Sequence, residues 1–144
     1  MNPDDQMLES VANEKGTYVL FIELSKPSVI RIGKLGKGKF PSGLYAYVGS
    51  AIGPGGLRAR ISHHLRDKKK FHWHIDYFLK HSKVVDVFTT RRRCEKKIAR
   101  KLLNTGKCAM KGFGSSDDDE NESHLIYFSS MSVEEIKKIL SQII

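Results

Sequence analysis

Two nine-residue stretches in the first third of the chain have the hydrophobic pattern of strands. Residues 16–24 (GTYVLFIEL) are rich in β-branched and aromatic side chains, a composition typical of strands. Residues 43–51 (GLYAYVGSA) place Tyr45 and Tyr47 on one face and three aliphatic side chains on the other, because successive side chains of a strand point to opposite faces. Three further strands are predicted at residues 29–32, 84–89 and 124–128.

Helical periodicity marks four other segments. Leu57, Ile61 and Leu65 recur at intervals of four residues, which forms a stripe on one side of a helix. Near the carboxyl end, Ser132 and Glu135 have the spacing of a capping box that opens an amphipathic helix. The predicted helices cover residues 57–67, 72–81, 91–104 and 133–143.

These elements indicate one α/β domain of the α+β kind. A length of 144 residues is typical of a single domain, and we expect a flexible leader at residues 1–14 followed by the domain at 15–144. Glycine, proline and charged residues predict a mobile basic loop at 34–42 and a loop at 111–122. No apolar run approaches the roughly 20 residues that span a bilayer. Two cysteines are too few for a disulfide framework, which predicts a cytoplasmic setting without a membrane.

The charge of the chain is concentrated in its middle third. The net charge is +9, and residues 58–101 alone contribute 15 Lys or Arg against 4 Asp or Glu. Two interpretations of this positive surplus are open. It serves solubility alone, or it attracts a polyanion, whose binding is driven by counterion release. Aromatic residues inside the basic block favour nucleic acid. The candidate nucleic-acid-binding residues are Lys39, Arg58, Arg66, Lys68, Lys69, Lys70, His72, His74, Arg91, Arg92 and Arg93.

A glycine-rich loop and an acidic residue suggest chemistry near the basic helix. Residues 53–56 (GPGG) precede that helix, and free N–H groups at a helix N-terminus suit a phosphate. Glu95 continues the apolar stripe of the helix at residues 91–104. Two interpretations of Glu95 are open. It either points inward and needs a cation or hydrogen bonds, or it occupies the first turn because the helix dipole favours it there.

Several short motifs follow one another in a specific order. They are Gly16-Thr17-Tyr18, Tyr47-Val48-Gly49, Arg60 with His64, and Glu95. Together they resemble the GIY-YIG nuclease superfamily over roughly residues 16–105. Further segments are similar to a small prokaryotic branch of it, a domain of unknown function sometimes joined to endonuclease III-like repair enzymes. These segments are Tyr47 to Leu57, His72-Trp73-His74-Ile75-Asp76, and Gly112-Phe113-Gly114 followed by Ser123-His124-Leu125.

The resemblance implies a small antiparallel, mainly three-stranded sheet flanked by helices, and cleavage of phosphodiesters with one Mg²⁺ or Mn²⁺ ion. In this picture Tyr18 is the general base or positions water, and nearby cations lower its pKa. Arg60 holds the scissile phosphate and Glu95 binds the metal, while Tyr47 and His64 complete the catalytic group. Two departures are Thr17 in place of isoleucine and an acidic run at 117–122 where the branch has cysteines.

The leading hypothesis is a metal-dependent endonuclease that acts on DNA, with a role in repair as an extension. The alternatives are a nucleic-acid-binding domain, for DNA or RNA, that keeps the fold without cleaving, and a basic domain that binds an acidic protein. Without the resemblance, Tyr18 and Tyr47 are ordinary strand aromatics and Arg60 with His64 form a solvated helix edge. We also expect the acidic run at residues 117–122 to cover part of the basic face.

Overall fold

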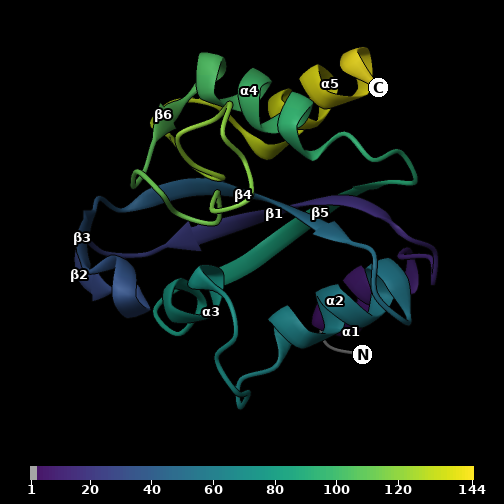
Figure 1. The fold of residues 1–144 in the computed structure, drawn as a ribbon, viewed down its shortest axis with the longest axis horizontal. Helices are drawn as coiled ribbons and strands as arrows, with labels where there is room; N and C mark the ends of the chain where they lie inside the picture. The colour runs from purple at the N-terminus through teal and green to yellow at the C-terminus, as the bar shows by residue number, and fades with distance from the viewer. Residues whose placement is uncertain (1–2) are drawn as a thin grey trace.

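The computed structural model describes residues 3–144 and contains a five-stranded antiparallel sheet in the order β5-β1-β4-β7-β6 (Figure 1). The mainly three-stranded sheet that the resemblance implied is therefore too small. The two-residue strand β6 was not predicted, because it is too short to show a pattern. The five strands are β1 (Gly16–Leu24), β4 (Gly43–Ala51), β5 (Lys83–Thr90), β6 (Lys107–Cys108) and β7 (Leu125–Phe128).

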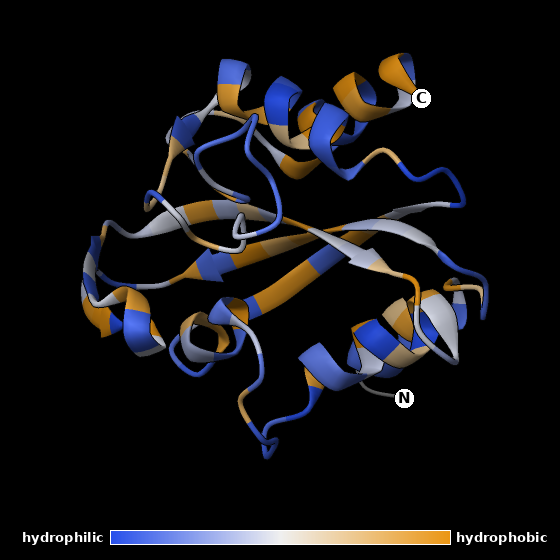
Figure 2. Ribbon diagram, viewed as in Figure 1, coloured by the Kyte–Doolittle hydropathy of each residue, from blue (hydrophilic) through white to orange (hydrophobic). Residues whose placement is uncertain are grey.

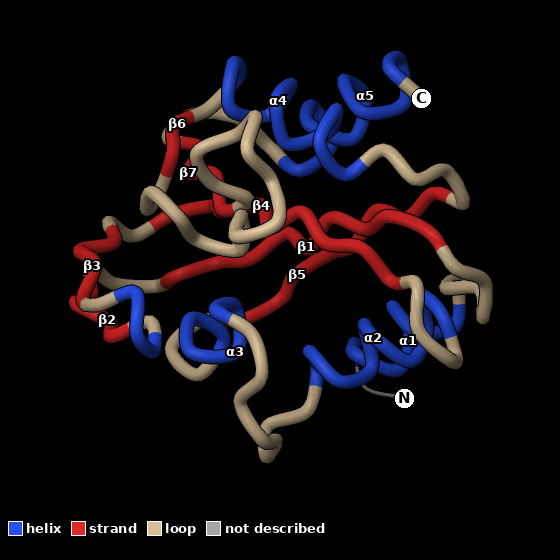
Figure 3. The backbone as a smooth tube through the Cα atoms, viewed as in Figure 1, coloured by secondary structure: helices blue, strands red, loops and turns tan. Residues whose placement is uncertain are grey.

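Helices cover both faces of this sheet, and long loops connect them (Figures 1 and 3). On one face lie α1 (Pro3–Glu9), α2 (Gly56–Leu65) and α3 (His74–Leu79); on the other lie α4 (Glu95–Thr105) and α5 (Val133–Ile143). The α+β class is confirmed, and the four predicted helices are present; α5 has the predicted bounds, whereas α2 and α3 are shorter than predicted and α4 begins at Glu95 instead of residue 91. The predicted capping box of α5 is present, because the Ser132 hydroxyl accepts from the Glu135 N–H at 3.2 Å.

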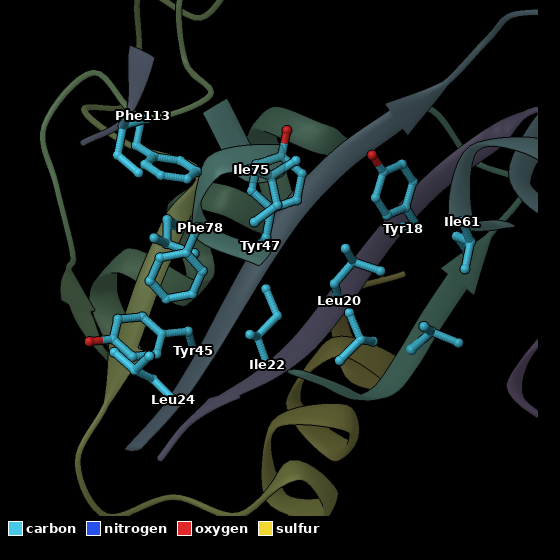
Figure 4. Packing of buried hydrophobic residues seen from close by; sticks show 14 of the residues in the cluster. Tyr18, Leu20, Ile22, Leu24, Tyr45, Tyr47, Ile61, Ile75, Phe78 and Phe113 are labelled. Carbon is cyan, nitrogen blue, oxygen red and sulfur yellow. The ribbon is translucent and has the colours of Figure 1, made fainter. Parts of the chain in front are cut away.

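The alternation of side chains along β1 and β4 creates two separate cores, one on each face of the sheet. Tyr18, Leu20 and Ile22 of β1 pack with Tyr45 and Tyr47 of β4 on the face covered by α2 and α3 (Figure 4). The intervening residues pack under α4 and α5. Orange segments therefore run along both central strands in Figure 2, whereas the outer surfaces of the helices carry blue.

Residues 28–40 form a small second sheet beside α3. Strand β2 (Ser28–Arg31) pairs with β3 (Lys37–Phe40), and the 3-10 turn η1 (Gly33–Leu35) connects them. The prediction of a mobile loop over residues 34–42 is thus wrong for most of its length. Three of the four residues of β3 are lysine or glycine, and this composition concealed the strand because neither residue favours one. Lys39 extends from this hairpin with an exposed side chain.

The segment predicted as a flexible leader carries α1, which contacts α2. Val11 follows it and is 1% exposed in the core. Residues 1–2 of that predicted leader lie outside the described residues. Over the part of the chain that the structure describes, no helix is long and apolar enough to cross a bilayer.

The junction between α1 and α2 depends on a glycine. Gly56 has a φ of +61°, and a Cβ there would lie 2.4 Å from the carbonyl oxygens of Asn13 and Glu14. We predict that Gly56→Ala lowers the free energy of unfolding by about 2 kcal/mol or more, because both the left-handed backbone and the contact oppose a side chain.

Urea denaturation of the purified variants measures this effect. Gly53→Ala is the matched control from the same loop, since a Cβ at Gly53 meets nothing within 4 Å. Equal destabilisation by the two substitutions would contradict the assignment of the strain to Gly56.

Candidate functional site

Two tyrosines on neighbouring strands form the centre of the candidate site. Tyr18 of β1 pairs with Gly49 of β4, and Tyr47 pairs with Leu20. Their ring centroids are 6.4 Å apart, and Figure 4 shows the two hydroxyl groups directed toward the same end of the sheet. The hydroxyl of Tyr45, two residues earlier on β4, points away and donates to the Pro41 carbonyl.

Gly49 leaves the space that the ring of Tyr18 occupies. A Cβ at residue 49 would lie 2.2 Å from Cζ of Tyr18 and 2.3 Å from its hydroxyl oxygen. Because any side chain there would displace the ring, the glycine two positions after Tyr47 determines where the Tyr18 hydroxyl lies. The spacing of the Tyr-Val-Gly motif thus has a direct packing reason.

His64 joins this centre from the last turn of α2. Its Nε2 lies 2.7 Å from the Tyr18 hydroxyl oxygen, and the residue is 3% exposed. Burial lowers the pKa of His64, although the carboxylate of Asp76 acts in the opposite direction. His64 is therefore held as a neutral imidazole near pH 7, with one nitrogen available to accept a proton.

Arg60 lies one turn before His64 and is held by two contacts. Its Nη1 donates to the Ser50 carbonyl at 3.0 Å, and its guanidinium lies 4.2 Å from the centre of the Trp73 ring. The side chain lines a hollow of about 240 Å³ that also includes Gly53 and His72. The glycine-rich loop, the first turns of α2 and a fixed guanidinium therefore adjoin the same space.

Thr17, the residue before Tyr18, holds the start of α4 and with it Glu95. The Thr17 hydroxyl donates to the Arg92 carbonyl at 2.8 Å and accepts from the Cys94 N–H at 3.1 Å. This anchors the segment that enters α4, so that Glu95 follows directly beside β1. Thr17, which stands where the resembling motif has isoleucine, thus has a structural role that its sequence position did not reveal.

The two interpretations of Glu95 are combined in its position. It is the first residue of α4, and its side chain is 30% exposed. Burial raises its pKa above the ordinary value; Asp118 and Asp117 add to this, whereas His124 and Arg60 oppose it. Binding a cation would relieve this unfavourable placement of a carboxylate.

A buried histidine and aspartate support Glu95 from the loop before β7. His124 Nδ1 lies 3.8 Å from a carboxylate oxygen of Glu95, and His124 Nε2 lies 2.7 Å from Oδ2 of Asp118. Asp118 also accepts from the Asn121 side chain at 2.7 Å. The sequence interpretation missed this network, because Asp118 stands inside an acidic run that predicts a solvated loop. The motif Ser123-His124-Leu125 was the one signal that could have pointed to it.

The environment of Tyr18 differs from the expectation that cations lower its pKa. Burial, with a further contribution from Tyr47, raises the pKa of Tyr18 well above its ordinary value, and Arg60 only partly opposes this. Burial also raises the pKa of Tyr47, which is 7% exposed. Neither phenol is poised as a free phenolate, so Tyr18 could accept a proton only if it passed its own to an acceptor such as His64.

The residues present fit a divalent ion held by one carboxylate. Mg²⁺ is commonly bound through one or two carboxylates, with waters and substrate phosphate completing its shell, and Glu95 supplies a partly exposed carboxylate. Among residues 3–144, no group of three or more His, Cys, Asp or Glu side chains is arranged for a single metal ion. Glu95 is thus the carboxylate through which the expected Mg²⁺ or Mn²⁺ would be held.

The predicted nucleic-acid-binding residues fall into separate regions. Arg93 lines a groove of about 590 Å³ with Glu95 and Lys96, and His72 lines the hollow beside Arg60. Arg66, Lys68 and Lys69 line another cleft of about 700 Å³ on the far side of His64. The remaining members are engaged with the protein or stand exposed elsewhere. Arg58 donates to Val11, Arg91 pairs with Glu14, His74 accepts from Gly114, and Lys39, Lys70 and Arg92 are exposed.

The acidic run contacts the basic side of α4 directly. Lys96 Nζ lies 3.8 Å from Asp119 and 3.9 Å from Glu120, and Arg100 lies 3.5 Å from Glu120. Asn121 donates to the Lys96 carbonyl at 3.0 Å and fixes the segment on the helix. The expectation that the acidic run covers part of the basic face is borne out for these two cations.

Comparison with known proteins identifies the chain at the level of a family. A family model described as a domain of unknown function, DUF123, matches residues 17–144. That range includes the tyrosines, α2, α4 and the acidic run. No curated protein and no solved structure gives a significant match.

The Asp118–His124 pair predicts an acid-dependent stability. Although burial raises the pKa of Asp118, hydrogen bonds from His124 and Asn121 lower it to about 2. An aspartate in an unfolded chain titrates near pH 3.9. The stabilisation is therefore present above about pH 4 and is lost as the pH falls toward 2.

We predict that Asp118→Asn removes about 1–2 kcal/mol of the difference between the free energies of unfolding at pH 5 and pH 2. Urea titrations across that range measure it. Asp119→Asn is the control, because the side chain of Asp119 is 94% exposed. The same pH dependence in wild type and Asp118→Asn would show that the pair does not stabilise the fold.

Proposed function

The chain belongs to the DUF123 family, and we propose that it is a divalent-metal-dependent endonuclease of the GIY-YIG kind that cleaves phosphodiester bonds in DNA. The observation that supports this most directly is the convergence of four side-chain types from three elements, β1, α2 and α4. A phenol and an imidazole are in hydrogen-bond contact, with a guanidinium and a carboxylate beside them. These are Tyr18, His64, Arg60 and Glu95.

Arg60 suits the recognition of the scissile phosphate. Its guanidinium is held by Ser50 and Trp73, so little side-chain freedom remains to be lost on binding. A planar guanidinium donates two parallel hydrogen bonds to phosphate oxygens. Its fixed charge also stabilises the negative charge that develops on those oxygens during displacement.

Tyr18 and His64 provide a path for the proton of the attacking water. The hydroxyl oxygen of Tyr18 lies 2.7 Å from Nε2 of His64, and in this scheme the hydroxyl donates to that nitrogen. Because the pKa of Tyr18 is raised, the phenol passes its own proton to His64 as it takes one from water. In this scheme Tyr47, the more exposed tyrosine, hydrogen-bonds the water or the phosphate.

Glu95 would hold the divalent ion, which when bound supplies Lewis-acid stabilisation of the phosphate and the leaving oxygen. His124 and Thr17 keep that carboxylate at the N-terminal end of α4, near the tyrosines. The groove that includes Arg93, Lys96 and Arg100 extends from Glu95. We propose that it holds the DNA backbone through phosphate contacts.

The burial of Tyr18 favours a second candidate, a nucleic-acid-binding domain that keeps this fold without cleaving. Tyr18 is 1% exposed, so water reaches its hydroxyl only if substrate binding opens the site. The basic surface serves both candidates equally. Cleavage therefore has to be separated from binding in one set of assays.

We predict that the wild-type protein cleaves DNA with Mg²⁺ or Mn²⁺, and that Glu95→Gln lowers the rate by about 100-fold or more through loss of the carboxylate ligand. DNA binding by the variant should stay within about twofold, because a single neutralised acid adds no phosphate contact. A panel of duplex, flap, branched and single-stranded DNA, with matched RNA, measures both quantities.

Glu23→Gln is the matched control, since Glu23 is an exposed acid near the end of β1. Binding without cleavage across the whole panel would replace the proposal with the second candidate. If the protein neither binds nor cleaves any nucleic acid in the panel, a protein partner for the basic face would be favoured. A weak dependence of binding on salt would also argue against phosphate contacts.

The acidic run should compete with DNA for Lys96 and Arg100. We predict that the double variant Asp119→Asn/Glu120→Gln binds DNA about threefold to tenfold more tightly at low salt, because both cations lose their internal partners. Fluorescence anisotropy at several salt concentrations measures the gain. Glu134→Gln/Glu135→Gln on α5 is a control with equal charge change, and unchanged affinity of the first double variant would exclude competition.

A further inference from the structure

Three buried polar atoms on α2 and α3 face one another without a hydrogen-bond partner. They are His63 Nε2, His64 Nδ1 and Asp76 Oδ1, and no other buried side-chain nitrogen or oxygen of the described residues is in this state. Asp76 Oδ1 lies 3.5 Å from the His63 atom and 3.8 Å from the His64 atom. Buried polar groups are nearly always paired, so a cluster of unpaired atoms behind Tyr18 calls for a functional explanation.

Asp76 is held as a carboxylate by the backbone. Its side chain is 0% exposed, and its other oxygen, Oδ2, accepts from the N–H groups of His72 at 2.8 Å and Trp73 at 3.0 Å. Burial by itself raises its pKa, but the His64 ring and these two N–H groups lower it well below the ordinary value. These bonds cap the start of α3 and use only Oδ2. Capping α3 therefore does not explain why Oδ1 faces two imidazole rings.

The opposite side of His64 contacts Tyr18. A neutral imidazole has one N–H group and one acceptor nitrogen, and a carboxylate can only accept. The N–H group is therefore favoured on Nδ1, toward Asp76, which leaves Nε2 free to accept from the Tyr18 hydroxyl at 2.7 Å. The groups that face His64 from the surrounding elements are Tyr18, Tyr47, His63, Lys69 and Asp76.

We propose that Asp76 is a positioning residue that acts through His64 by selecting the Nδ1–H tautomer and stabilising the imidazolium formed when Tyr18 transfers its proton. The O–H bond of Tyr18 breaks, an Nε2–H bond forms, and the phenol recovers a proton from the attacking water. His63 then offers a route to solvent, since its Nε2 faces the same carboxylate oxygen and its side chain is 18% exposed. The catalytic use of this chain rests on the proposed endonuclease function, whereas the tautomer does not.

The first test uses the free protein and needs no substrate. Long-range ¹H–¹⁵N spectra of the imidazole rings distinguish the two tautomers and follow the titration of His64. We expect the Nδ1–H form in the wild type. The Nε2–H form there would overturn the proposal without any variant.

Asp76→Asn then removes the charge while keeping an oxygen that can accept the two backbone N–H groups. The pKa of His64 should fall by about 1 or more, because the carboxylate stabilises the charged ring, and the Nδ1–H tautomer should no longer dominate. Asp67→Asn, an exposed acid in the loop after α2, should leave both unchanged. An unchanged His64 pKa in Asp76→Asn would contradict the proposed role.

The second test is the pH profile of cleavage. Asp76→Asn should lower kcat by about 100-fold or more, as expected when a base is held in the wrong tautomer. It should also displace the acid limb of the profile to lower pH, because that limb follows the pKa of His64. A loss of kcat with an unmoved limb would assign Asp76 a merely structural role.

The endonuclease function and the role of Asp76 can be contradicted independently of each other. If the wild type does not cleave any substrate, the endonuclease function fails, while the tautomer and the His64 titration still decide the role of Asp76. If Asp76→Asn does not fold, the wild-type tautomer remains decisive, and His63→Gln tests the route to solvent. That variant should slow proton release at low buffer concentration, and added imidazole buffer should restore the rate; no effect of buffer would exclude the route.

Discussion

The pairing of Tyr18 with Gly49 across β1 and β4 is the constraint on which the candidate site depends. A side chain at Gly49 would occupy the position of the Tyr18 ring, so the register of the two strands determines where the hydroxyl lies. A shift by one residue would turn Tyr18 to the opposite face of the sheet, under α4 and α5, because successive side chains alternate. The proposed roles of His64, Arg60 and Glu95 all depend on the position of that hydroxyl.

The two-sided sheet explains how distant segments reach this point. Tyr18 and Tyr47 lie on the face covered by α2 and α3, whereas Glu95 begins a helix that covers the other face. Thr17 connects the two, since its hydroxyl holds the backbone before α4 while the next residue points toward α2. The acid thus lies close enough to both phenols at the end of the sheet to influence their pKa values.

Electrostatics divides the site into an interior and a rim with different tasks. In the interior, burial raises the pKa of Tyr18 and lowers that of His64, which keeps both neutral and suits them to exchange a proton. At the rim, Lys96 and Arg100 are paired with the acidic run. A polyanion that binds there has to displace the carboxylates of the acidic run. The acidic run would therefore weaken the binding of polyanions that cannot compete for Lys96 and Arg100.

Local patterns were enough to predict much of this fold and the members of its centre. The residue types of 16–24 and the alternation in 43–51 identified both central strands and placed Tyr47 on one face with Tyr45, and the period near four identified the helices. The order of the motifs selected Tyr18, Tyr47, Arg60, His64 and Glu95. Strands β3 and β6 were missed, because lysine and glycine or a length of two residues leaves no periodic signal.

Only the tertiary structure decided which side chain meets which. The partners Tyr18 and His64 are 46 residues apart, and Thr17 and Arg92 are 75 apart. In the sequence Asp76 is only part of a short segment of the resemblance and Asp118 is one charge in an acidic run, whereas packing places them against His64 and His124. The sequence determined the faces of its strands and helices, because those follow from neighbours along the chain. The contacts follow from register and helix docking, which are set by packing across the whole domain.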